Sequence, residues 1–466
     1  MQAISIVGTG YVGLSTAVCF ASRGFRVIAS THDKEKAETI NSKRAPFYEP
    51  RLDEMLRESV ESKMLRAIDT RAEAVLQTEV TFLTVGTPET ADGRIDLRHV
   101  VRACEEIGRA LKKKNAYHLI IIKSTVVPGT TRDVVKPILE RTAELSAGPD
   151  FGLCMNPEFL RQGSAIADTL RPDRVVVGEY DERSGKMLEG LFDSFYEHKV
   201  RTLRMNLESA EMVKYASNAF LATKISYANE IANICEKVSG VDVSHVMAGV
   251  GLDVRINPKF LNAGAGFGGS CLPKDVKALR AFAGSHGYET PLLRAVIAVN
   301  DAQALHVAEL ALAKLGQPKG KKVALLGLAF KSNTDDVREA PSLKIAKALL
   351  SAEAHVSAFD PVVKKISLPG FEALECADSI PACLSGAHCC VVATEWQEFK
   401  ALTPDDFIGY MAKPIVIDAR RIFDPRQFRL RLEFSAVGLG GGENLTGSHA
   451  SRDSKPRTEP PDALNR

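Results

Sequence analysis

The sequence lacks an excess of either charge, a long apolar run and any C-x-x-C pair. Its 466 residues include 60 Lys and Arg against 58 Asp and Glu, which gives a formal net charge of +2. This balance argues against a nucleic-acid-binding surface spread over the fold. No apolar run reaches roughly 18 residues, and the N-terminus lacks the basic region of a secretory signal. The sequence therefore predicts neither a nucleic-acid partner nor a membrane partner.

The nine cysteines are odd in number and scattered along the chain. Cys389 and Cys390 are adjacent within an apolar run, where we expect them to face opposite sides of a strand. The pattern predicts a reducing, cytoplasmic location, with no disulfide framework and no bound metal.

The first 30 residues contain a glycine-rich turn between a strand and a helix. An apolar strand at 3–7 leads into Gly-Thr-Gly-Tyr-Val-Gly at 8–13, and a helix and a second strand at 26–30 follow. In this context G-x-G-x-x-G is typical of a dinucleotide site, because the glycines let a pyrophosphate approach the N-terminus of the helix. The alternative is a turn that only packs the helix against the strand.

Strand patterns at 80–85, 118–123, 151–155 and 174–177 continue this half of the chain. They alternate with helical patterns, which predicts an α/β fold with a parallel, doubly wound sheet. We expect residues 1–200 to form this dinucleotide-binding Rossmann domain.

A segment without proline or glycine follows at 207–238, with apolar residues at helical spacing. As one helix it would be about 45–50 Å long at 1.5 Å per residue, too long for one layer of a domain. We therefore expect it to link two domains within a central helical region at 201–310. Because long connecting helices often pair between subunits, this region is also expected to mediate dimerisation.

The opening pattern returns in the C-terminal part of the chain. Its strand patterns fall within 323–330, 355–359, 389–393 and 415–417. This second Rossmann-like half (311–438) lacks G-x-G-x-x-G, so it either binds a different nucleotide or is a degenerate structural copy. Residues 439–466 are rich in Gly, Ser, Pro and charge, and are expected to form a disordered tail.

Cys271 follows four glycines within 264–269 and precedes Pro273 at the start of a predicted helix. The glycines would let a bulky ligand approach the backbone. A helix N-terminus and the ammonium group of Lys274 both favour a thiolate, so Cys271 is predicted to be a nucleophile. The alternative for any single cysteine is a small buried apolar side chain, our interpretation for most of the others.

Three polar residues suggest chemistry but leave a plainer alternative open. Lys214 and Asn218 share a face of the long helix, either as a solvated stripe or as donors to a developing oxyanion. Glu158 follows a predicted strand at the edge where α/β sheets bind ligands, or is a loop acid in solvent.

Over residues 3 to about 425, the chain resembles the UDP-glucose/GDP-mannose dehydrogenase family. The motifs that carry the resemblance are GTGYVG at 8–13, KSTV at 123–126, NPEFL at 156–160, KYASNAF at 214–220, GGSCLPKD at 268–275 and GLAFK at 327–331. TDDVREAP at 334–341, TEW at 394–396 and DARR at 418–421 are closest to the UDP-glucose branch, although Leu272-Pro273 is closer to the GDP-mannose branch.

The resemblance implies an enzyme that oxidises a sugar primary alcohol to a carboxylate in one site with two NAD. Cys271 would hold the aldehyde as a thiohemiacetal and then as a thioester, which prevents a reactive aldehyde from escaping. The other implied catalytic roles are oxyanion stabilisation by Lys214 and Asn218, water ordering by Asp275, thioester hydrolysis with Glu158, and positioning of water and cofactor by Thr125.

The resemblance also implies two sets of binding residues. NAD is expected to contact Gly8, Gly10, Tyr11, Val12, Gly13, Thr31, Asp33, Lys36, Thr87, Thr125, Gln162, Lys274 and Arg338. The nucleotide sugar, UDP-glucose, is expected to contact Glu158, Phe159, Leu160, Lys214, Asn218, Arg255, Phe260, Asn262, Gly266, Phe267, Gly268, Lys331, Arg420 and Arg421. In the family the equivalent of Arg255 comes from a neighbouring subunit, which implies a homodimer or a higher homo-oligomer.

Two positions depart from the family. Gln162 stands where many members have Glu, and Thr31 stands where an acid binds the adenosine ribose. That acid selects NAD and repels the extra phosphate of NADP. Either Asp33 replaces it and NAD specificity is kept, or NADP is also used, with Lys34 or Lys36 pairing the phosphate.

Two alternative functions stay open from the sequence. One is a dehydrogenase for another nucleotide sugar, such as GDP-mannose or a UDP-N-acetylhexosamine. The other, from a different class, is a non-catalytic nucleotide-sugar-binding protein.

Overall fold

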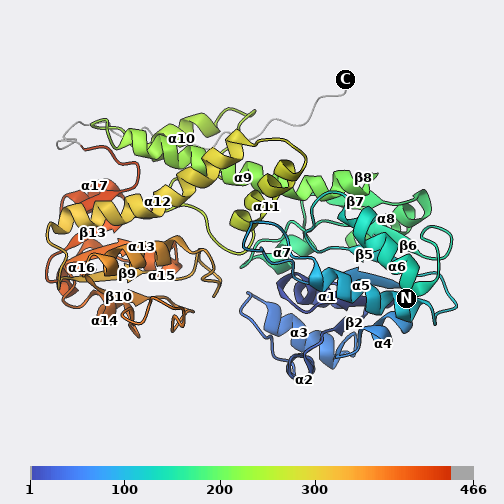
Figure 1. Cartoon of the computed structure of the whole chain (residues 1–466). Coiled ribbons are helices and arrows are strands. Elements are labelled where there is room, and N and C mark those ends of the chain that lie inside the picture. Colours follow the sequence, from blue (N-terminus) through green and yellow to red (C-terminus); the bar gives the residue numbers. More distant parts are fainter. Residues whose placement is uncertain (1–2, 442–466) are drawn as a thin grey trace, which may run out of the picture.

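The computed structural model describes residues 3–441 and has two lobes, each built on one β-sheet (Figure 1). The long helix α9 (Leu207–Cys235) runs from the N-terminal lobe to the C-terminal lobe, and α12 (Pro291–Leu315) packs beside it over the C-terminal lobe. The α/β fold with two Rossmann-like domains and a long central helix is therefore confirmed.

The N-terminal sheet has eight strands in the order β3-β2-β1-β4-β5-β6-β7-β8. Their bounds are β1 (Ala3–Val7), β2 (Arg26–Ser30), β3 (Leu65–Ile68), β4 (Val80–Leu83), β5 (Leu119–Ile122), β6 (Gly152–Met155), β7 (Val175–Glu179) and β8 (Thr202–Asn206). The helices of this lobe are α1 (Tyr11–Ser22), α2 (Lys34–Asn41), α3 (Leu52–Glu61), α4 (Arg71–Leu76), α5 (Arg98–Leu111), the π-helical turn η1 (Thr131–Val135), α6 (Lys136–Ala143), α7 (Ala165–Leu170) and α8 (Glu182–Tyr196).

One edge of this sheet is not parallel, so the prediction of a wholly parallel sheet was wrong there. β7 pairs antiparallel with β6 and parallel with β8. A parallel crossover needs a dozen or more residues to return to the opposite end of the sheet. The connection after β6, residues 156–174, is long enough for a crossover, but its one helix, α7, has 6 residues and packs against α1. β7 begins at the end of the sheet where β6 ends and runs back beside it.

Strands buried on both faces explain the apolar runs of this lobe. Ile4 and Ile6 of β1 pack into one core cluster with Phe20 of α1, whereas Val7 packs with Leu83 on the other face. β3 and β8 were not predicted, because β3 alternates buried with exposed residues and β8 is only partly buried.

The C-terminal sheet has six strands in the order β11-β10-β9-β12-β13-β14, all parallel. Its elements are β9 (Lys322–Leu326), α13 (Pro341–Ser351), β10 (His355–Phe359), β11 (Glu375–Cys376), α14 (Ile380–Leu384), β12 (Cys389–Val392), α15 (Gln397–Lys400), α16 (Pro404–Tyr410), β13 (Ile415–Asp418), α17 (Pro425–Arg429) and β14 (Glu433–Ala436). Cys389 and Cys390 belong to different core clusters, which confirms that they face opposite sides of β12.

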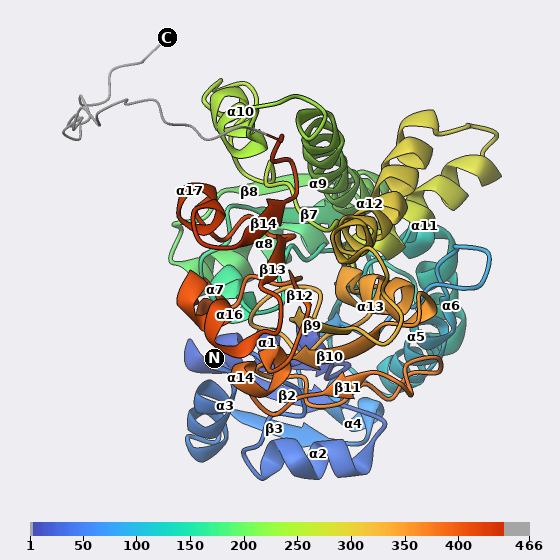
Figure 2. The same cartoon turned by 90° about the vertical axis from the view of Figure 1, so that its left-hand side faces the viewer.

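The central helices α9 and α12 lie side by side (Figure 2). α9 begins at an N-cap, Asn206, whose side chain accepts from the Ser209 amide, and it packs on α10 (Val243–Gly251), α11 (Leu272–Ser285) and α12. Among the described residues, α12 is the one helix long and apolar enough to cross a membrane by length and composition. Its buried face, which includes Val307 and Ala311, packs into the core of the C-terminal lobe.

The chain beyond β14 returns to the central helices, so the predicted tail is wrong for its first residues. Leu439 forms a β-bridge with Asp242, and the Gly440 amide donates to the Val241 carbonyl at 2.9 Å. Hydrogen bonding to this loop orders a segment whose composition alone indicated disorder. The remainder of the predicted tail, 442–466, lies outside the described residues.

Candidate active site

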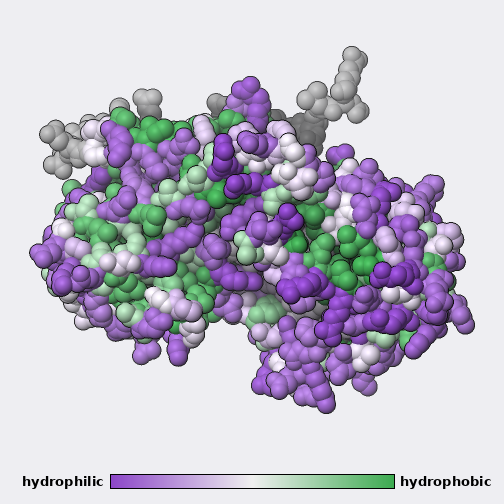
Figure 3. Space-filling view, viewed as in Figure 1, coloured by the Kyte–Doolittle hydropathy of each residue, from purple (hydrophilic) through white to green (hydrophobic). Residues whose placement is uncertain are grey.

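A cleft of about 2150 Å³ opens between the two lobes, under the central helices. Figure 3 shows a largely hydrophilic face with an indentation where the lobes meet. Pockets for one small molecule usually measure roughly 300–1,000 Å³, so this cleft has room for more than one ligand.

The glycine-rich turn at the start of α1 fits a dinucleotide pyrophosphate. Gly10 is the N-cap of α1 and lines the cleft, and no protein atom lies within 4 Å of the point where its Cβ would be. A Cβ on Gly13 would lie 1.9 Å from the Gly8 carbonyl oxygen, so Gly13 packs the helix against the turn. The open space at Gly10, beside the free amides of a helix N-terminus, suits an anionic ligand.

Lys214 and Glu158 form a buried ion pair, with 2.8 Å between Nζ and Oε1 and side chains 4% and 6% exposed. Burial opposes the charge on Glu158, but the Lys214 ammonium group and the Leu160 amide together hold its pKa below the usual value. Burial also opposes the charge on Lys214, yet Glu158 and Asp275 hold the pKa of Lys214 above the usual value. The solvent alternatives for Lys214 and Glu158 are therefore wrong.

Asn218 lies one turn further along α9 and donates its side-chain amide to Asp275 Oδ2 at 2.6 Å. Asp275 is 1% exposed, and its Oδ1 accepts from Lys274 Nζ at 2.6 Å. Lys274 is thus paired with Asp275 and does not act on the Cys271 thiol as the sequence suggested.

Cys271 is the N-cap of α11 and is exposed on the wall of the cleft. The loss of hydration among the surrounding cleft residues and then the Glu158 carboxylate raise the pKa of the thiol, whereas the Lys214 ammonium group lowers it. Lys214 is therefore the cation that favours the thiolate. Among the other eight cysteines, seven are buried and Cys376 is intermediate.

Lys123, at the carboxyl end of β5, was missing from the predicted site. Its Nζ donates to Asn156 Oδ1 at 2.8 Å, and burial lowers the pKa of Lys123 to about 8, against the effect of Glu158. A charged residue that ends an apolar strand could have signalled this position. Thr125, two residues on, lines the cleft, and its carbonyl accepts from Thr87 Oγ1 at 2.7 Å.

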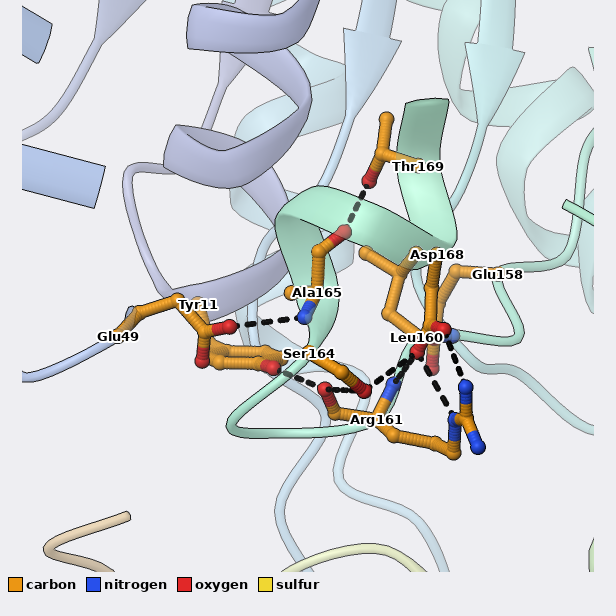
Figure 4. Close-up of polar contacts among 9 residues, drawn as sticks. All are labelled: Tyr11, Glu49, Glu158, Leu160, Arg161, Ser164, Ala165, Asp168 and Thr169. Carbon is orange, nitrogen blue, oxygen red and sulfur yellow. Dashed lines mark hydrogen bonds and ion pairs between the residues drawn. The ribbon is translucent and has the colours of Figure 1, made fainter. Parts of the chain in front are cut away.

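The loop between β6 and α7 is held by a second group that sequence reasoning missed (Figure 4). Glu49 is 5% exposed and accepts from the amides of Gly163 and Ala165 at 2.7 and 2.8 Å. The Tyr11 hydroxyl donates to the Arg161 carbonyl at 2.5 Å. These contacts anchor the loop that begins with Glu158. The only indication of this anchoring role in the sequence was that Glu49 is an acidic residue within 47–50.

Three arginines of the predicted binding sets already have protein partners. Arg421 Nη2 donates to both carboxylate oxygens of Asp242, at 2.6 and 2.7 Å, and so connects the C-terminal lobe to the central helices. Arg420 donates to the carbonyls of Ala393 and Phe330. Arg338 pairs with Asp336, which also accepts from Gln162 across the cleft at 3.0 Å.

The glycines before Cys271 pack closely against other parts of the protein as well as lining the cleft. Gly269 has φ +82°, and a Cβ there would lie 2.8 Å from the Phe330 ring. The need for glycine at this position thus comes from packing against the C-terminal lobe, which corrects the ligand-based expectation.

The cleft brings together nearly all predicted site residues. Its lining includes Gly8, Gly10, Tyr11, Val12, Thr31, Asp33, Lys36, Thr87, Thr125, Glu158, Phe159, Leu160, Gln162, Lys214, Asn218, Phe260, Asn262, Gly266, Phe267, Gly268, Cys271, Lys274, Asp275, Lys331, Arg338, Arg420 and Arg421. Gly13 lies behind the lining, and Arg255 lies outside the cleft, where its exposed side chain pairs with Asp253 at 2.6 Å.

Fold and site together define an oxidoreductase with a dinucleotide fold, a second nucleotide-type fold and a cysteine in the shared cleft. The chain belongs to the UDP-glucose/GDP-mannose dehydrogenase family, which confirms the resemblance. It matches the family's NAD binding domain at 2–196, its central domain at 208–302 and its UDP binding domain at 324–425. It is accordingly an NAD-dependent nucleotide-sugar dehydrogenase.

Similar proteins cover nearly the whole chain. UDP-glucose 6-dehydrogenase AglM of Haloferax volcanii is 43% identical over 91% of this chain and 98% of its own length. UDP-glucose 6-dehydrogenase TuaD of Bacillus subtilis is 41% identical over 91% and 90%. A UDP-glucose dehydrogenase structure from Pyrobaculum islandicum has a TM-score of 0.85 and 36% identity, and covers 95% of this chain and 97% of its own.

Proposed function

We propose that this chain is a UDP-glucose 6-dehydrogenase, which converts the sugar primary alcohol to a carboxylate and reduces two NAD. The observation that carries the proposal is the cluster of Cys271, Lys214, Glu158, Asn218 and Asp275 in one cleft. Relatives with this name at about 40% identity over most of the chain support the choice of sugar nucleotide.

Each bound NAD would supply one hydride acceptor. The turn at 8–13 would hold its pyrophosphate at the N-terminus of α1, where the structure leaves space at Gly10. Thr87, Thr125 and Lys274 line the same cleft as this turn and Cys271. Their role would be to orient the cofactor toward the sugar.

The first oxidation turns the C6 alcohol into an aldehyde, with loss of a hydride and a proton. The Cys271 thiolate then attacks the aldehyde carbon: a C–S bond forms, and the carbonyl oxygen gains an electron pair and takes a proton. The donors that would stabilise this oxyanion are the Lys214 ammonium group and the Asn218 amide, both fixed by carboxylates.

The second oxidation removes a hydride and a proton from the thiohemiacetal and leaves a thioester. Water then adds to the thioester carbon, the C–S bond breaks, and the thiolate leaves with its electron pair. We assign proton acceptance from this water to Glu158 and its orientation to Asp275. A charged Glu158, held so by Lys214, is suited to accept a proton.

We also propose a cytoplasmic homodimer in which the partner completes the site. Arg255 lies outside the cleft of its own chain, as expected of a residue that serves a neighbouring subunit. α9 carries exposed apolar side chains, including Phe220 at 64%, Tyr227 at 51% and Ile234 at 55%, which would be buried between subunits.

The proposal is tested by the stoichiometry of the reaction with limiting UDP-glucose and excess NAD. We expect about two NADH and one carboxylate per sugar. One NADH per sugar with free aldehyde would overturn the four-electron mechanism.

A substrate panel of UDP-glucose, GDP-mannose and UDP-N-acetylhexosamines, compared by kcat/KM, tests the sugar. A preference for a nucleotide sugar other than UDP-glucose would keep the chemistry but replace the substrate. Absence of turnover with every sugar would favour the non-catalytic binding protein.

A further inference from the structure

We propose that Lys36 and Arg71 form a subsite for the ribose 2′-phosphate of NADP, so that this chain uses NADP as well as NAD. The proposal rests on the proposed function for its reaction, but it concerns only the adenosine end of the cofactor site.

Thr31 stands where an acid that binds the ribose 2′-hydroxyl is expected, and the nearest acid that lines the cleft, Asp33, caps helix α2. Thr31 follows β2 and is 5% exposed, and its hydroxyl oxygen accepts from the Asp33 amide at 3.2 Å. Asp33 is the N-cap of α2, where its Oδ1 accepts from the Lys36 amide at 3.0 Å. The carboxylate that could have replaced the missing acid is therefore committed to capping a helix.

Arg71 brings a buried guanidinium group to the same edge of the sheet. The Thr31 amide donates to the Ile68 carbonyl at 3.0 Å, so the ends of β2 and β3 are adjacent, and Arg71 follows β3 by three residues. Arg71 is 7% exposed and lines the cleft. Its Nη1 lies 2.9 Å from Glu106, but among the described residues neither Nη1 nor Nε has a hydrogen-bond partner. A buried unsatisfied donor on a residue that lines a cleft suits a phosphate oxygen.

Lys36 supplies a second cation at this end of the cleft. It lines the cleft with Thr31 and Arg71, whereas Lys34 is not part of the lining. Lys36 is partly buried, and this burial lowers the pKa of its amino group, against the effect of Asp33. Within residues 3–441 we find no hydrogen bond or ion pair from this amino group. A partly buried cation without an ion-pair partner attracts a phosphate more strongly than a fully solvated one.

The test is calorimetric titration of the full chain with NADP and with NAD, without sugar. We expect the two Kd values to agree within about tenfold, since Thr31 replaces the acid that would repel the phosphate and Lys36 and Arg71 attract it. Lys36→Gln should raise the Kd for NADP about tenfold more than the Kd for NAD, because Lys36 is expected to contact both cofactors but only NADP carries the extra phosphate. Arg71→Gln should act in the same direction.

Two further variants make the result specific. Lys34→Gln is the matched control, because it removes the same charge on the same helix outside the cleft, and it should leave both Kd values unchanged. Thr31→Asp should raise the Kd for NADP by about tenfold or more relative to that for NAD.

A natural chain that binds NADP more than about 100-fold more weakly than NAD would overturn the subsite, as would equal effects of Lys36→Gln and Lys34→Gln. If the melting temperature shows that Arg71→Gln is unfolded, the Kd values of Lys36→Gln alone test the subsite. Because these titrations contain no sugar, their outcome is independent of whether UDP-glucose is the substrate.

Discussion

At the scale of single residues, neighbouring groups act in opposite directions on the pKa of the Cys271 thiol. The loss of hydration within the cleft and the Glu158 carboxylate raise the pKa of this thiol, and Lys214 lowers it. The thiolate predominates only above that pKa, so the balance sets the pH range in which the cysteine is an effective nucleophile.

Lys214→Ala should move the pH profile of Cys271 alkylation to higher pH, because it removes the cation that favours the thiolate. The rate of iodoacetamide modification of the free enzyme, measured against pH, checks this. Turnover should fall by about 10²–10³ with a smaller change in KM, since an oxyanion donor acts in the transition state.

Lys186→Ala serves as the control for that experiment, because Lys186 pairs with Glu182 on the exposed surface of α8. It should leave the profile where it was. A change in KM alone after Lys214→Ala would return Lys214 to a binding role.

Cys271→Ser should prevent normal formation of the carboxylate. An alkoxide leaves far less readily than a thiolate, so the reaction should stop after the first oxidation or trap a stable ester on the substituted side chain. Intact mass and NADH yield per sugar distinguish these outcomes. Carboxylate production at the natural rate would identify another residue as the nucleophile.

Spacing alone predicted that Lys214 and Asn218 share a face, but it could not decide whether that face meets solvent. Burial depends on α11, which brings Asp275 from a distant part of the sequence. For the same reason Lys274 looked like the partner of Cys271, although it pairs with its own neighbour, Asp275.

At the scale of elements, Glu49 anchors the loop that carries Glu158. Glu49→Gln keeps the shape but can accept from only one of the two loop amides, which leaves a buried donor unpaired. The free energy of unfolding should fall by about 1–3 kcal/mol, and kcat should fall as Glu158 loses its fixed position. Urea unfolding and steady-state kinetics measure the two effects.

Glu54→Gln is the matched control, because Glu54 is exposed on α3 close to Glu49 in sequence. It should change neither stability nor kcat. A Glu49→Gln enzyme that loses stability but keeps its kcat would limit Glu49 to a structural role.

Most strands were predictable because they are apolar on both faces, as in β5 and β12. β8 was not, because an edge strand is only partly buried and lacks that run. The antiparallel direction of β7 was not predictable either. It depends on the path of the connection that contains the short helix α7, and hydrophobic periodicity carries no information about strand direction.

At the scale of the whole molecule, the sequence predicted two nucleotide folds but not how they meet. The lobes touch through Gln162 and Asp336, and Arg421 joins Asp242 of the central region. These partners are far apart in the sequence, and nothing in the local patterns pairs them. The cleft is a property of their assembly, so local sequence patterns did not predict which side chains meet across it.

The C-terminal segment gives a test at the same scale. The Gly438 amide donates to Glu236 at 2.8 Å, its carbonyl accepts from the Val243 amide at 2.9 Å, and the Gly440 amide donates to Val241 at 2.9 Å. A chain that ends after Gly441 keeps all three bonds, so we expect it to retain the natural melting temperature and kcat. A chain that ends after Val437 loses them, at about 1 kcal/mol for each bond, and its melting temperature should fall. Thermal unfolding and turnover of the two truncated chains, compared with the full chain, check both expectations. Loss of activity from removing 442–466 alone would mean that those residues contribute to the site. Equal stability of the two truncated chains would mean that the hydrogen bonds of Gly438 and Gly440 do not hold the lobe against α9.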